Sequence, residues 1–289
     1  MTSSLDAGVA VRAHKSLDSL HSLIYFVPEA EQEYTAIGLK PGRMGYFASR
    51  SAAMGPVAGG VTAATFFNFS PSLVARSIPA AWELASCPDI LAARLRAADR
   101  SWRRLLGDDV VDGAEVNEAA DLAARAAANL PVDGRPLFAA HADLDAPSEP
   151  HLALWHAITL LREYRGDGHI AALVRNRLSG LEALITHTHT GAGFTVAAAK
   201  ATRGWSDEAW AAGEAGLRDR GLLDGDGLTD QGTALRATVE QDTDLAAEAP
   251  WVQLGPDGTE RLREIGKKLT RAVAAAGAFP PGVFAAAKA

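Results

Sequence analysis

A chain of 289 residues with a formal net charge of −7 is long enough for two modest domains, or for one helical body with an appended module. Hydrophobic residues make up 48% and charged residues 22%, proportions that exclude long disordered stretches and are typical of a globular protein. The negative charge repels nucleic acid and anionic membranes, so any contact with DNA requires a local basic patch.

The single cysteine, Cys87, excludes a disulfide within the chain, and a reducing cytoplasm is the compartment that we expect. Cys87 precedes Pro88 at a predicted helix end, and no charge pattern around it would lower the thiol pKa. We therefore interpret it as a buried, inert thiol. No segment has the length and apolarity of a membrane span, and the first residues lack the pattern of a signal peptide. These features predict a cytoplasmic protein with no membrane partner.

Alanine is abundant and runs of β-branched residues are scarce, so we expect helices to dominate. The first half divides into short apolar or helical segments, among them 20–27, a helix to about Ile37, 43–50, 61–67, a helix from Ser70 to about Glu83 that Pro79 kinks or splits, 90–106 and 118–129. Residues 131–150 are rich in proline, glycine and aspartate and show no strong period. We predict the main boundary there, between an N-terminal helical domain, 1–145, and a second domain, 146–289.

The second domain opens with sharper helix signals. His151 to Arg165 is predicted as one helix with Gly166 as its C-terminal stop, and Asp167 is expected to cap the next helix, to about residue 177. Ser179 and Glu182 form a capping box for a third helix that runs to about residue 187.

From Phe194 the predicted order is helix, turn, helix, wing, helix. Gly204 lies in the turn, Ser206 is a suitable N-cap for the second helix, and a long helix follows from about Asp230. Two short apolar pairs flank Asp-Gly-Asp-Gly at 224–227, which predicts a two-stranded wing near 222–229. The fold class that we predict is mainly α: a multi-helical body with a winged helix-turn-helix module that contains a short two-stranded β wing.

Two resemblances support this prediction. The run Leu217-Arg218-Asp219-Arg220-Gly221-Leu222-Leu223, followed by Leu228-Thr229, Gly232 and Leu235, resembles the end of the recognition helix, the wing and the next helix of MarR-type regulators. The chain from about residue 17 to 281, most clearly over residues 154–169, resembles an actinobacterial family of helix-turn-helix proteins of unknown function. The resemblance implies a winged-helix fold and, by analogy, a homodimer, but it implies no activity.

The charge of this module differs from what DNA binding requires. The candidate DNA-contacting residues are Arg203, Trp205, Arg218 and Arg220. Residues 203–247 contain four arginines and no lysine against ten Asp or Glu, and the predicted wing tip carries Asp224 and Asp226. A protein that reads DNA neutralises phosphates with Lys and Arg along the recognition helix and the wing. The sequence therefore predicts weak or lost DNA reading.

Six of the eight histidines lie between His141 and His189, where arginines and carboxylates also gather. In the helix predicted from His151, His156 and Glu163 lie seven residues apart on one face, and two arginines continue its apolar stripes. One interpretation is a pocket in which arginine holds an anion and a histidine exchanges protons. The other is a structural cluster of ion pairs and helix caps. The candidates are Trp155, His156, Arg162, Glu163, Arg165, Asp167 and His169.

The first half contributes a second group of polar candidates among glycine, aromatic and small residues: Arg43, Tyr46, Arg50 and Asn68. They would either face the pocket across a domain interface or cover the contact between helices. The function that we predict is binding of a small anionic or aromatic molecule by a winged-helix protein, with MarR-like transcriptional regulation possible. The alternative is an enzyme that uses His156, Glu163, His169 and Arg162 for acid–base chemistry.

No cofactor or metal is predicted. The sequence contains no phosphate loop, dinucleotide fingerprint, nucleophile elbow or zinc-protease motif. His187 and His189 do not share a helical face at a spacing of two, so a zinc site would require other ligands from elsewhere in the fold.

Overall fold

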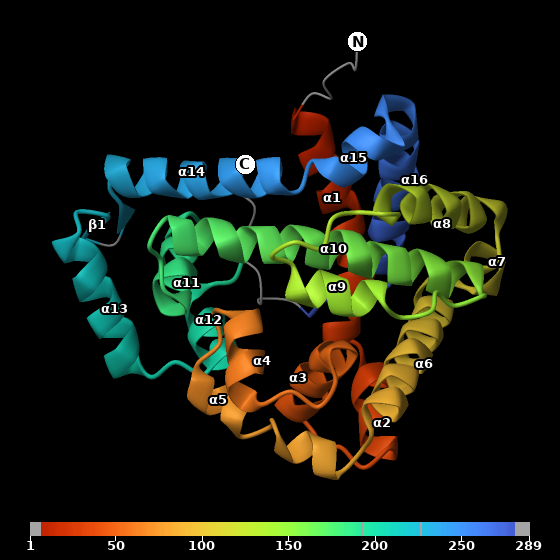
Figure 1. Cartoon of the computed structure of the whole chain (residues 1–289), viewed down its shortest axis with the longest axis horizontal. Coiled ribbons are helices and arrows are strands. Elements are labelled where there is room, and N and C mark those ends of the chain that lie inside the picture. The colour runs from red at the N-terminus through yellow and green to blue at the C-terminus, as the bar shows by residue number, and fades with distance from the viewer. Residues whose placement is uncertain (1–6, 192, 226, 281–289) are drawn as a thin grey trace.

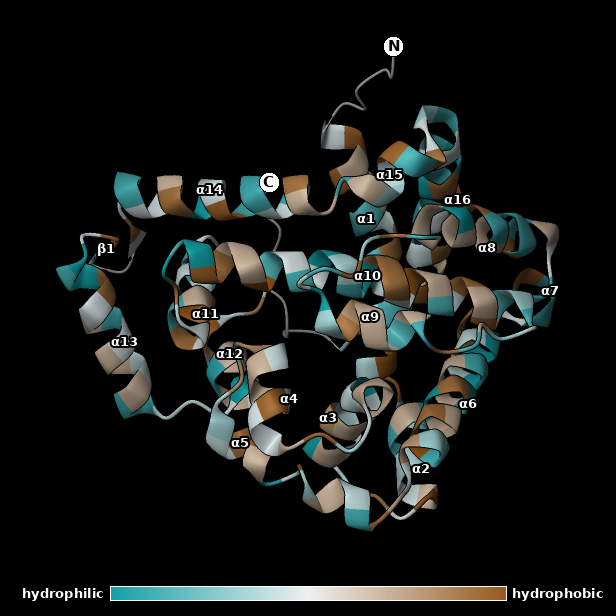
Figure 2. Cartoon of the chain, in the orientation of Figure 1, coloured by the Kyte–Doolittle hydropathy of each residue, from teal (hydrophilic) through white to brown (hydrophobic). Residues whose placement is uncertain are grey.

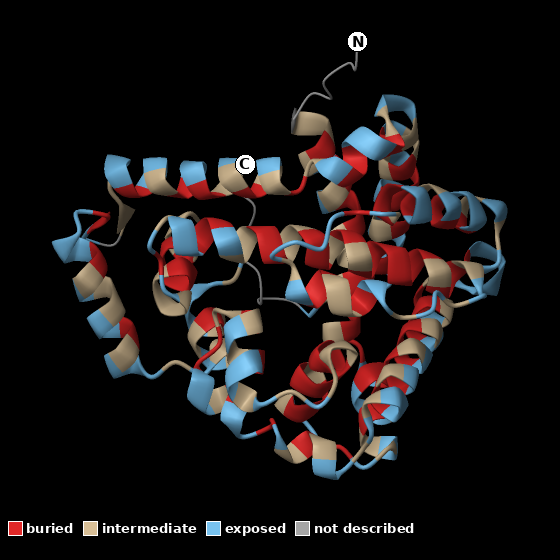
Figure 3. Ribbon diagram, viewed as in Figure 1, coloured by how far each residue is buried: buried red, intermediate tan, exposed pale blue. Residues whose placement is uncertain are grey.

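One long helix, α10 (Pro150–Arg175), runs through the middle of the computed structural model, and the other elements pack around it (Figure 1). The structure describes residues 7–191, 193–225 and 227–280. Buried residues occur along most of the length of α10 (Figure 3). A helix enclosed by neighbours in this way has no need of one polar and one apolar face, and Figure 2 shows mixed colours on α10.

The elements that precede α10 are short, apart from three longer helices. They are α1 (Ala7–Ser22), η1 (Leu23–Tyr25), α2 (Pro28–Ala36), α3 (Arg43–Ser51), η2 (Ala52–Met54), α4 (Gly59–Phe66), α5 (Pro71–Ala75), η3 (Ala80–Glu83), α6 (Cys87–Leu106), α7 (Asp108–Val111), α8 (Ala114–Ala127) and α9 (Pro136–Ala142).

The elements that follow α10 form a winged helix and then return to the first helices of the chain. They are α11 (Gly180–His189), α12 (Val196–Arg203), α13 (Asp207–Asp219), β1 (Leu223–Asp224), β2 (Gly227–Leu228), α14 (Asp230–Ala246), α15 (Ala249–Leu254) and α16 (Pro256–Ala275). The strands are antiparallel, with Leu223 opposite Leu228. The predicted fold class is confirmed: the described chain is mainly helical with a short β wing.

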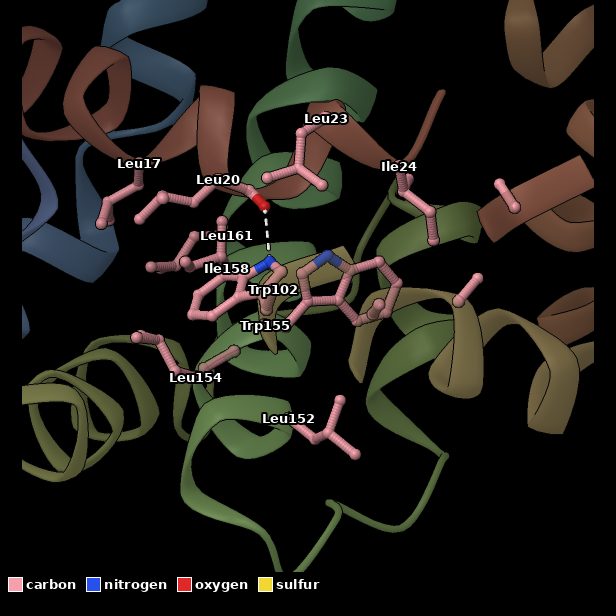
Figure 4. Close-up of a cluster of buried hydrophobic side chains, with 14 of the residues drawn as sticks. Leu17, Leu20, Leu23, Ile24, Trp102, Leu152, Leu154, Trp155, Ile158 and Leu161 are labelled. Carbon is pink, nitrogen blue, oxygen red and sulfur yellow. Dashed lines mark hydrogen bonds between the residues drawn. The ribbon is translucent and has the colours of Figure 1, made fainter. Parts of the chain in front are cut away.

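The larger apolar core joins both ends of the chain. Helix α16 packs against α1 and α8, where Gly266 allows its backbone to lie close to Leu17 and Ser16. Trp102 and Trp155 lie in this core beside leucines from α1, and the indole Nε1 of Trp102 donates to the carbonyl of Leu20 at 3.2 Å (Figure 4).

A smaller apolar core holds the winged helix together. It contains Leu173 at the end of α10 and residues of α11, α12, α13, the wing and α14, with Trp210 and Leu217 almost fully buried. Because α10 contributes Leu154 and Ile158 to the larger core and Leu173 to the smaller one, it ties the two parts together.

The helix stop predicted at Gly166 is wrong. Helix α10 continues through Gly166 and Gly168 to Arg175, although each interior glycine costs about 1 kcal/mol relative to alanine. A Cβ at Gly168 would lie 3.0 Å from both Ala246 Cβ and Arg135 Nη1. Gly168 is therefore a point where α14 approaches α10 closely, and neither Gly166 nor Gly168 ends the helix.

Cys87 lies at a helix end, as predicted, and this end is an N-terminus. It opens α6, where Ser86 is the N-cap and Pro88 occupies the first turn. The thiol is half-buried, and burial raises its pKa, so it is protonated at neutral pH.

Candidate functional site

A cleft of about 560 Å³ separates the winged helix from the N-terminal helices, with α10 as its floor. Its walls come from α1, α3, the segment after α4, α11 and α14. This volume falls within the range of sites that bind small molecules, and clefts between packed units are a frequent location for them.

The cleft collects most of the candidates that the sequence identified: Tyr46, Arg50, Asn68, Arg162, Glu163, Arg165, Asp167, His169 and Arg203. Trp155 and His156 line a different, smaller cavity, so the structure does not bring His156 together with Glu163. Arg43 lines neither cavity, and its guanidinium carbon lies 5.8 Å from the centre of the Tyr46 ring.

The lining of the cleft is rich in positive charge, although the protein as a whole is acidic. Six cationic side chains face four carboxylates: Lys15, Arg50, Arg162, Arg165, Arg203 and Arg236 against Asp18, Glu163, Asp167 and Glu240. The walls have a low dielectric constant, which strengthens the electric field of the excess positive charge. The cleft therefore attracts anions.

A buried network of two arginines and one glutamate lies at the centre of the floor. Arg50 Nη2 donates to both oxygens of Glu163, at 3.0 and 3.1 Å, and Arg162 Nη1 donates to Glu163 Oε1 at 3.3 Å. Arg50 also donates to the hydroxyl of Tyr46, and Arg162 Nε to Asp18. Burial alone would raise the pKa of Glu163, but the two guanidinium groups lower it to about 2.

Asp167 caps α9, not the helix that the sequence assigned to it. Its Oδ2 accepts the backbone N–H groups of Leu137 and Phe138, at 3.0 and 2.9 Å. Burial raises its pKa to about 6, against the opposing effect of those hydrogen bonds. The capping prediction was correct in kind and wrong in partner, because the sequence cannot show that α9 begins beside α10.

His169 is held in one tautomer by α14. Thr243 donates its own hydroxyl proton to the carbonyl of Val239 at 2.6 Å, so it accepts from His169 Nδ1, at 2.8 Å. Burial lowers the pKa of His169 to about 4. The ring is therefore neutral at pH 7, with its proton on Nδ1 and an unprotonated Nε2.

Arg203 differs from the other arginines of the cleft because it has no carboxylate partner among the described residues. Its guanidinium lies between the rings of Phe69 and Phe194, 4.6 Å from each ring centre. Nη1 donates to Thr202 Oγ1 at 3.0 Å, and the buried Nε has no hydrogen-bond partner. Burial lowers its pKa, and Arg43 and Arg50 reinforce that effect. The group remains a cation, held by aromatic rings and available to an anion.

The remaining DNA candidates are also engaged within the protein. Trp205 Nε1 donates to the carbonyl of Asn68 at 2.9 Å, which fixes the helix-turn-helix turn on the segment after α4. Arg218 pairs with Glu214, and Arg220 pairs with Glu182. Asp226 lies outside the described residues, and Asp224 is exposed. The arginines of the winged helix therefore do not form a basic ridge along α13.

Sequence reasoning missed the part of the site that comes from α1 and α14. His14, Lys15 and Asp18 line the cleft from α1, and Arg236 and Glu240 line it from α14, where Arg236 Nη2 donates to Glu240 Oε1 at 2.8 Å. Arg236 is buried on the same side of α14 as Val239, a signal that the sequence does carry. No group of three or more His, Cys, Asp or Glu side chains in the described ranges is arranged to hold a metal ion.

Comparison with known proteins places the chain in a family. A model for a helix-turn-helix family matches residues 10–280. The chain belongs to this helix-turn-helix family. No curated protein and no solved structure matches it. The family supports DNA-binding regulation at a general level. In this member the helix-turn-helix is α12 and α13, and Arg203 at the end of α12 lines the cleft. No helix in the described part of the chain is long and apolar enough to span a membrane.

Proposed function

We propose that this helix-turn-helix family member binds a small organic anion in the cleft between its winged helix and its N-terminal helices. The observation that carries the proposal is Arg203, a cation without a carboxylate partner among the described residues, whose buried Nε–H has no acceptor. Leaving such a donor unsatisfied costs about 1–3 kcal/mol, and an oxyanion of a ligand would recover this energy.

The ligand has a planar or aromatic part. Five aromatic side chains line the cleft beside the arginines, namely Tyr46, Phe66, Phe67, Phe69 and Phe194. Such rings provide flat apolar surface next to the charges that would hold the anionic group. The excess of two positive charges in the lining favours a dianion over a monoanion.

The acidic face of α13 supports ligand recognition over base reading. Asp207, Glu208 and Asp219 are exposed on this helix, and the family relationship by itself does not supply the cations that DNA needs. A regulatory role would then depend on a partner or on a homodimer that arranges two winged helices, as the resemblance to MarR-type proteins implies. Both the dimer and the MarR-like role are parts of this proposal.

Acid–base catalysis by His156, Glu163 and His169 has less support. A carboxylate with a pKa of about 2 between two guanidinium groups is a poor base, and His156 faces another cavity. His169 lines the cleft, and its unprotonated Nε2 would accept a hydrogen bond from a hydroxyl or N–H group of a bound ligand.

Calorimetric titration with phthalate and with benzoate tests the proposal, since the pair differs by one carboxylate. We expect saturable binding, tighter for phthalate, and a loss of about tenfold or more in affinity in Arg203→Gln. Arg218→Gln is the matched control, because it removes an exposed arginine of the same module that does not line the cleft. Absence of saturable binding by both acids, or equal loss in the two variants, would refute the proposal. Native mass spectrometry of the freshly purified protein then identifies the ligand that it carries.

A further inference from the structure

A second cavity, of about 240 Å³, lies beside the first half of α10, on the side away from the winged helix. It is formed by α6, by α9 with the loop that follows it, and by α10. Its walls are mostly apolar, and Leu91, Leu95, Leu144 and the indole of Trp155 contribute to them. Ala92 and Asp145 in its lining are exposed, so the cavity opens to solvent there.

Arg94 lies in this cavity and is only 2% exposed. Nη1 donates to the carbonyl of Ser49 at 2.9 Å, Nη2 donates to His21 Nε2 at 3.2 Å, and Nε has no partner. The guanidinium carbon also lies 5.0 Å from the centre of the Trp155 ring. Of the five N–H groups of an arginine, three are thus left without an acceptor among the residues that the structure describes.

No carboxylate pairs with Arg94 in the described ranges of the chain. Glu163, whose carboxylate interacts with Arg94 electrostatically, is hydrogen-bonded to Arg50 and Arg162. Asp145 lines the cavity too, but it is exposed and hydrated, so it opposes an incoming anion only weakly. A buried, unpaired guanidinium is costly, and proteins rarely retain one without a partner.

The other polar groups of the cavity are uncharged. Burial lowers the pKa of His141 to about 3 and also lowers the pKa of His156, and the charge of Arg94 adds to both effects. His141 Nε2 and Trp155 Nε1 are buried without a hydrogen-bond partner. Besides the exposed carboxylate of Asp145, the cavity therefore offers one positive charge, polar atoms without a partner among the described residues, and apolar walls.

We infer that this cavity binds a small monocarboxylic acid with an apolar chain or ring, whose carboxylate is held by Arg94 and whose apolar part lies against the leucines and Trp155. The single cation distinguishes it from the cleft, where six cationic side chains favour more highly charged ligands. The small volume, below the roughly 300–1,000 Å³ of sites for drug-sized molecules, limits the ligand to a short acid.

Titration with acetate, butanoate and hexanoate tests the inference, with calorimetry and tryptophan fluorescence as the two readouts. Each added buried methylene is worth about 0.8 kcal/mol, so we expect affinity to rise about fourfold per methylene until the cavity is full. Arg94→Met should weaken hexanoate binding by about tenfold or more. Ala92→Trp, at the exposed opening, should block the cavity without changing the core.

Two control variants distinguish binding in this cavity from binding in the cleft. Ala124→Trp makes the same substitution at an exposed position of α8 that lines neither cavity, and Arg203→Gln disables the cleft alone. Both should bind hexanoate like the wild type. The inference is overturned if hexanoate does not bind saturably, if Ala92→Trp leaves its affinity unchanged, or if Arg203→Gln abolishes its binding. Should Arg94→Met fail to fold, the pair Ala92→Trp and Ala124→Trp still decides the question.

Discussion

The arginines that line the two cavities fall into two kinds, which differ in whether a carboxylate pairs with them. Arg50 and Arg162 share Glu163, and Arg162 also pairs with Asp18, so their two charges are balanced inside the protein. Arg94 and Arg203 are held by aromatic rings and neutral acceptors and form no ion pair within the described chain. The first kind stabilises the fold of the floor, and the second is available to a ligand.

The first prediction concerns Glu163. Glu163→Gln leaves the buried guanidinium of Arg50 without its counter-ion and leaves the half-buried Arg162 with Asp18 alone, so we expect a loss of roughly 3–5 kcal/mol in the free energy of unfolding at pH 7. Because the folded-state pKa of about 2 lies below the model-peptide value of 4.5, the stabilisation by Glu163 is complete above pH 4.5 and is lost as pH falls toward 2.

Urea unfolding of wild type and Glu163→Gln across this pH range measures the effect. The gap between the two should narrow as pH falls below about 4.5. Glu83→Gln, at an exposed glutamate without an ion-pair partner among the described residues, is the control and should change stability by less than about 0.5 kcal/mol. A gap that does not depend on pH would contradict the ion-paired state of Glu163.

For individual residues, the sequence indicated which charged side chains belong to the site, but not which of them contact one another. It identified Arg162 because an arginine aligned with an apolar stripe is unusual, Glu163 because it shares a helix face with His156, and Arg50 because it lies among aromatic and small residues. It could not show that Arg50 and Glu163, which lie 113 residues apart, form a hydrogen-bonded pair. It assigned Arg203 to DNA contact as a cation of the helix-turn-helix module, whereas Phe69 and Phe194 hold it in the cleft.

Individual helices in this protein are governed by local caps and by distant close contacts, and the sequence shows only the first. The capping box of Ser179 and Glu182 and the N-cap at Ser206 were predicted and are confirmed, because both depend on residues three positions apart. Past Gly166, α10 packs against Arg135 and α14, which are remote in sequence.

The second prediction uses the cap between α10 and α9. Asp167→Ala removes the acceptor for two N–H groups of α9 and should destabilise the protein by about 1 kcal/mol or more. Asp167→Asn keeps an acceptor oxygen and removes the buried charge. Since the folded pKa of about 6 lies above the model-peptide value of 3.8, the wild type should lose stability as pH rises from about 4 through 6.

Thermal unfolding between pH 4 and 7 separates these effects. Asp167→Asn should lack the decline that the wild type shows, and its stability relative to wild type should be greatest at pH 7. An Asn variant that follows the wild-type pH profile would show that Asp167 does not titrate in this window.

The third prediction compares two glycines of α13. A Cβ at Gly213 would lie 2.7 Å from Ile185 Cδ1, so this glycine lets α13 pack against α11, whereas nothing lies within 4 Å of a Cβ at Gly216. Gly216→Ala should therefore stabilise the protein by about 0.4–1 kcal/mol. Gly213→Ala gains the same helix propensity but should be destabilising overall, because Ile185 must move.

Denaturant unfolding of the two variants at one pH provides the measurement, and each variant is the control for the other. Equal stabilisation by both substitutions would mean that α13 does not lie as close to α11 as the structure places it.

At the scale of the whole molecule, the main feature that the sequence did not reveal is the packing of the last helices against helices from the first half of the chain. Helices α15 and α16 follow the winged helix in the sequence but pack with α8 and α1. The winged helix is therefore inserted in the sequence between two segments that form one apolar core. The fold class was predictable from periodicity and turn residues. The pairing of α1 with α16 was not, because amphipathic helices do not encode which partner covers their apolar face. The cleft exists because of this arrangement, with α10 and α14 joining its two sides.

The last prediction addresses the exposed acidic residues of α13 and their effect on DNA binding by the whole protein. In the wild type the exposed acidic residues of α13 should keep binding to a labelled duplex of its own upstream DNA weak, with a shallow dependence on salt between about 50 and 200 mM. Replacing Asp207, Glu208 and Asp219 together with lysine should raise the affinity and steepen the logarithmic salt slope by about 0.9 for each phosphate contacted.

The matched control places the same change in charge elsewhere. Lysine at Asp109, Asp121 and Asp133, exposed positions outside the winged helix, alters the net charge equally. If the fold presents α13 to the duplex, only the first variant gains affinity in fluorescence anisotropy. Equal gains would show that net charge alone controls DNA binding. Tight, steeply salt-dependent binding by the wild type would instead mean that the helix-turn-helix reads DNA despite its carboxylates, and that the cleft serves a conventional regulator.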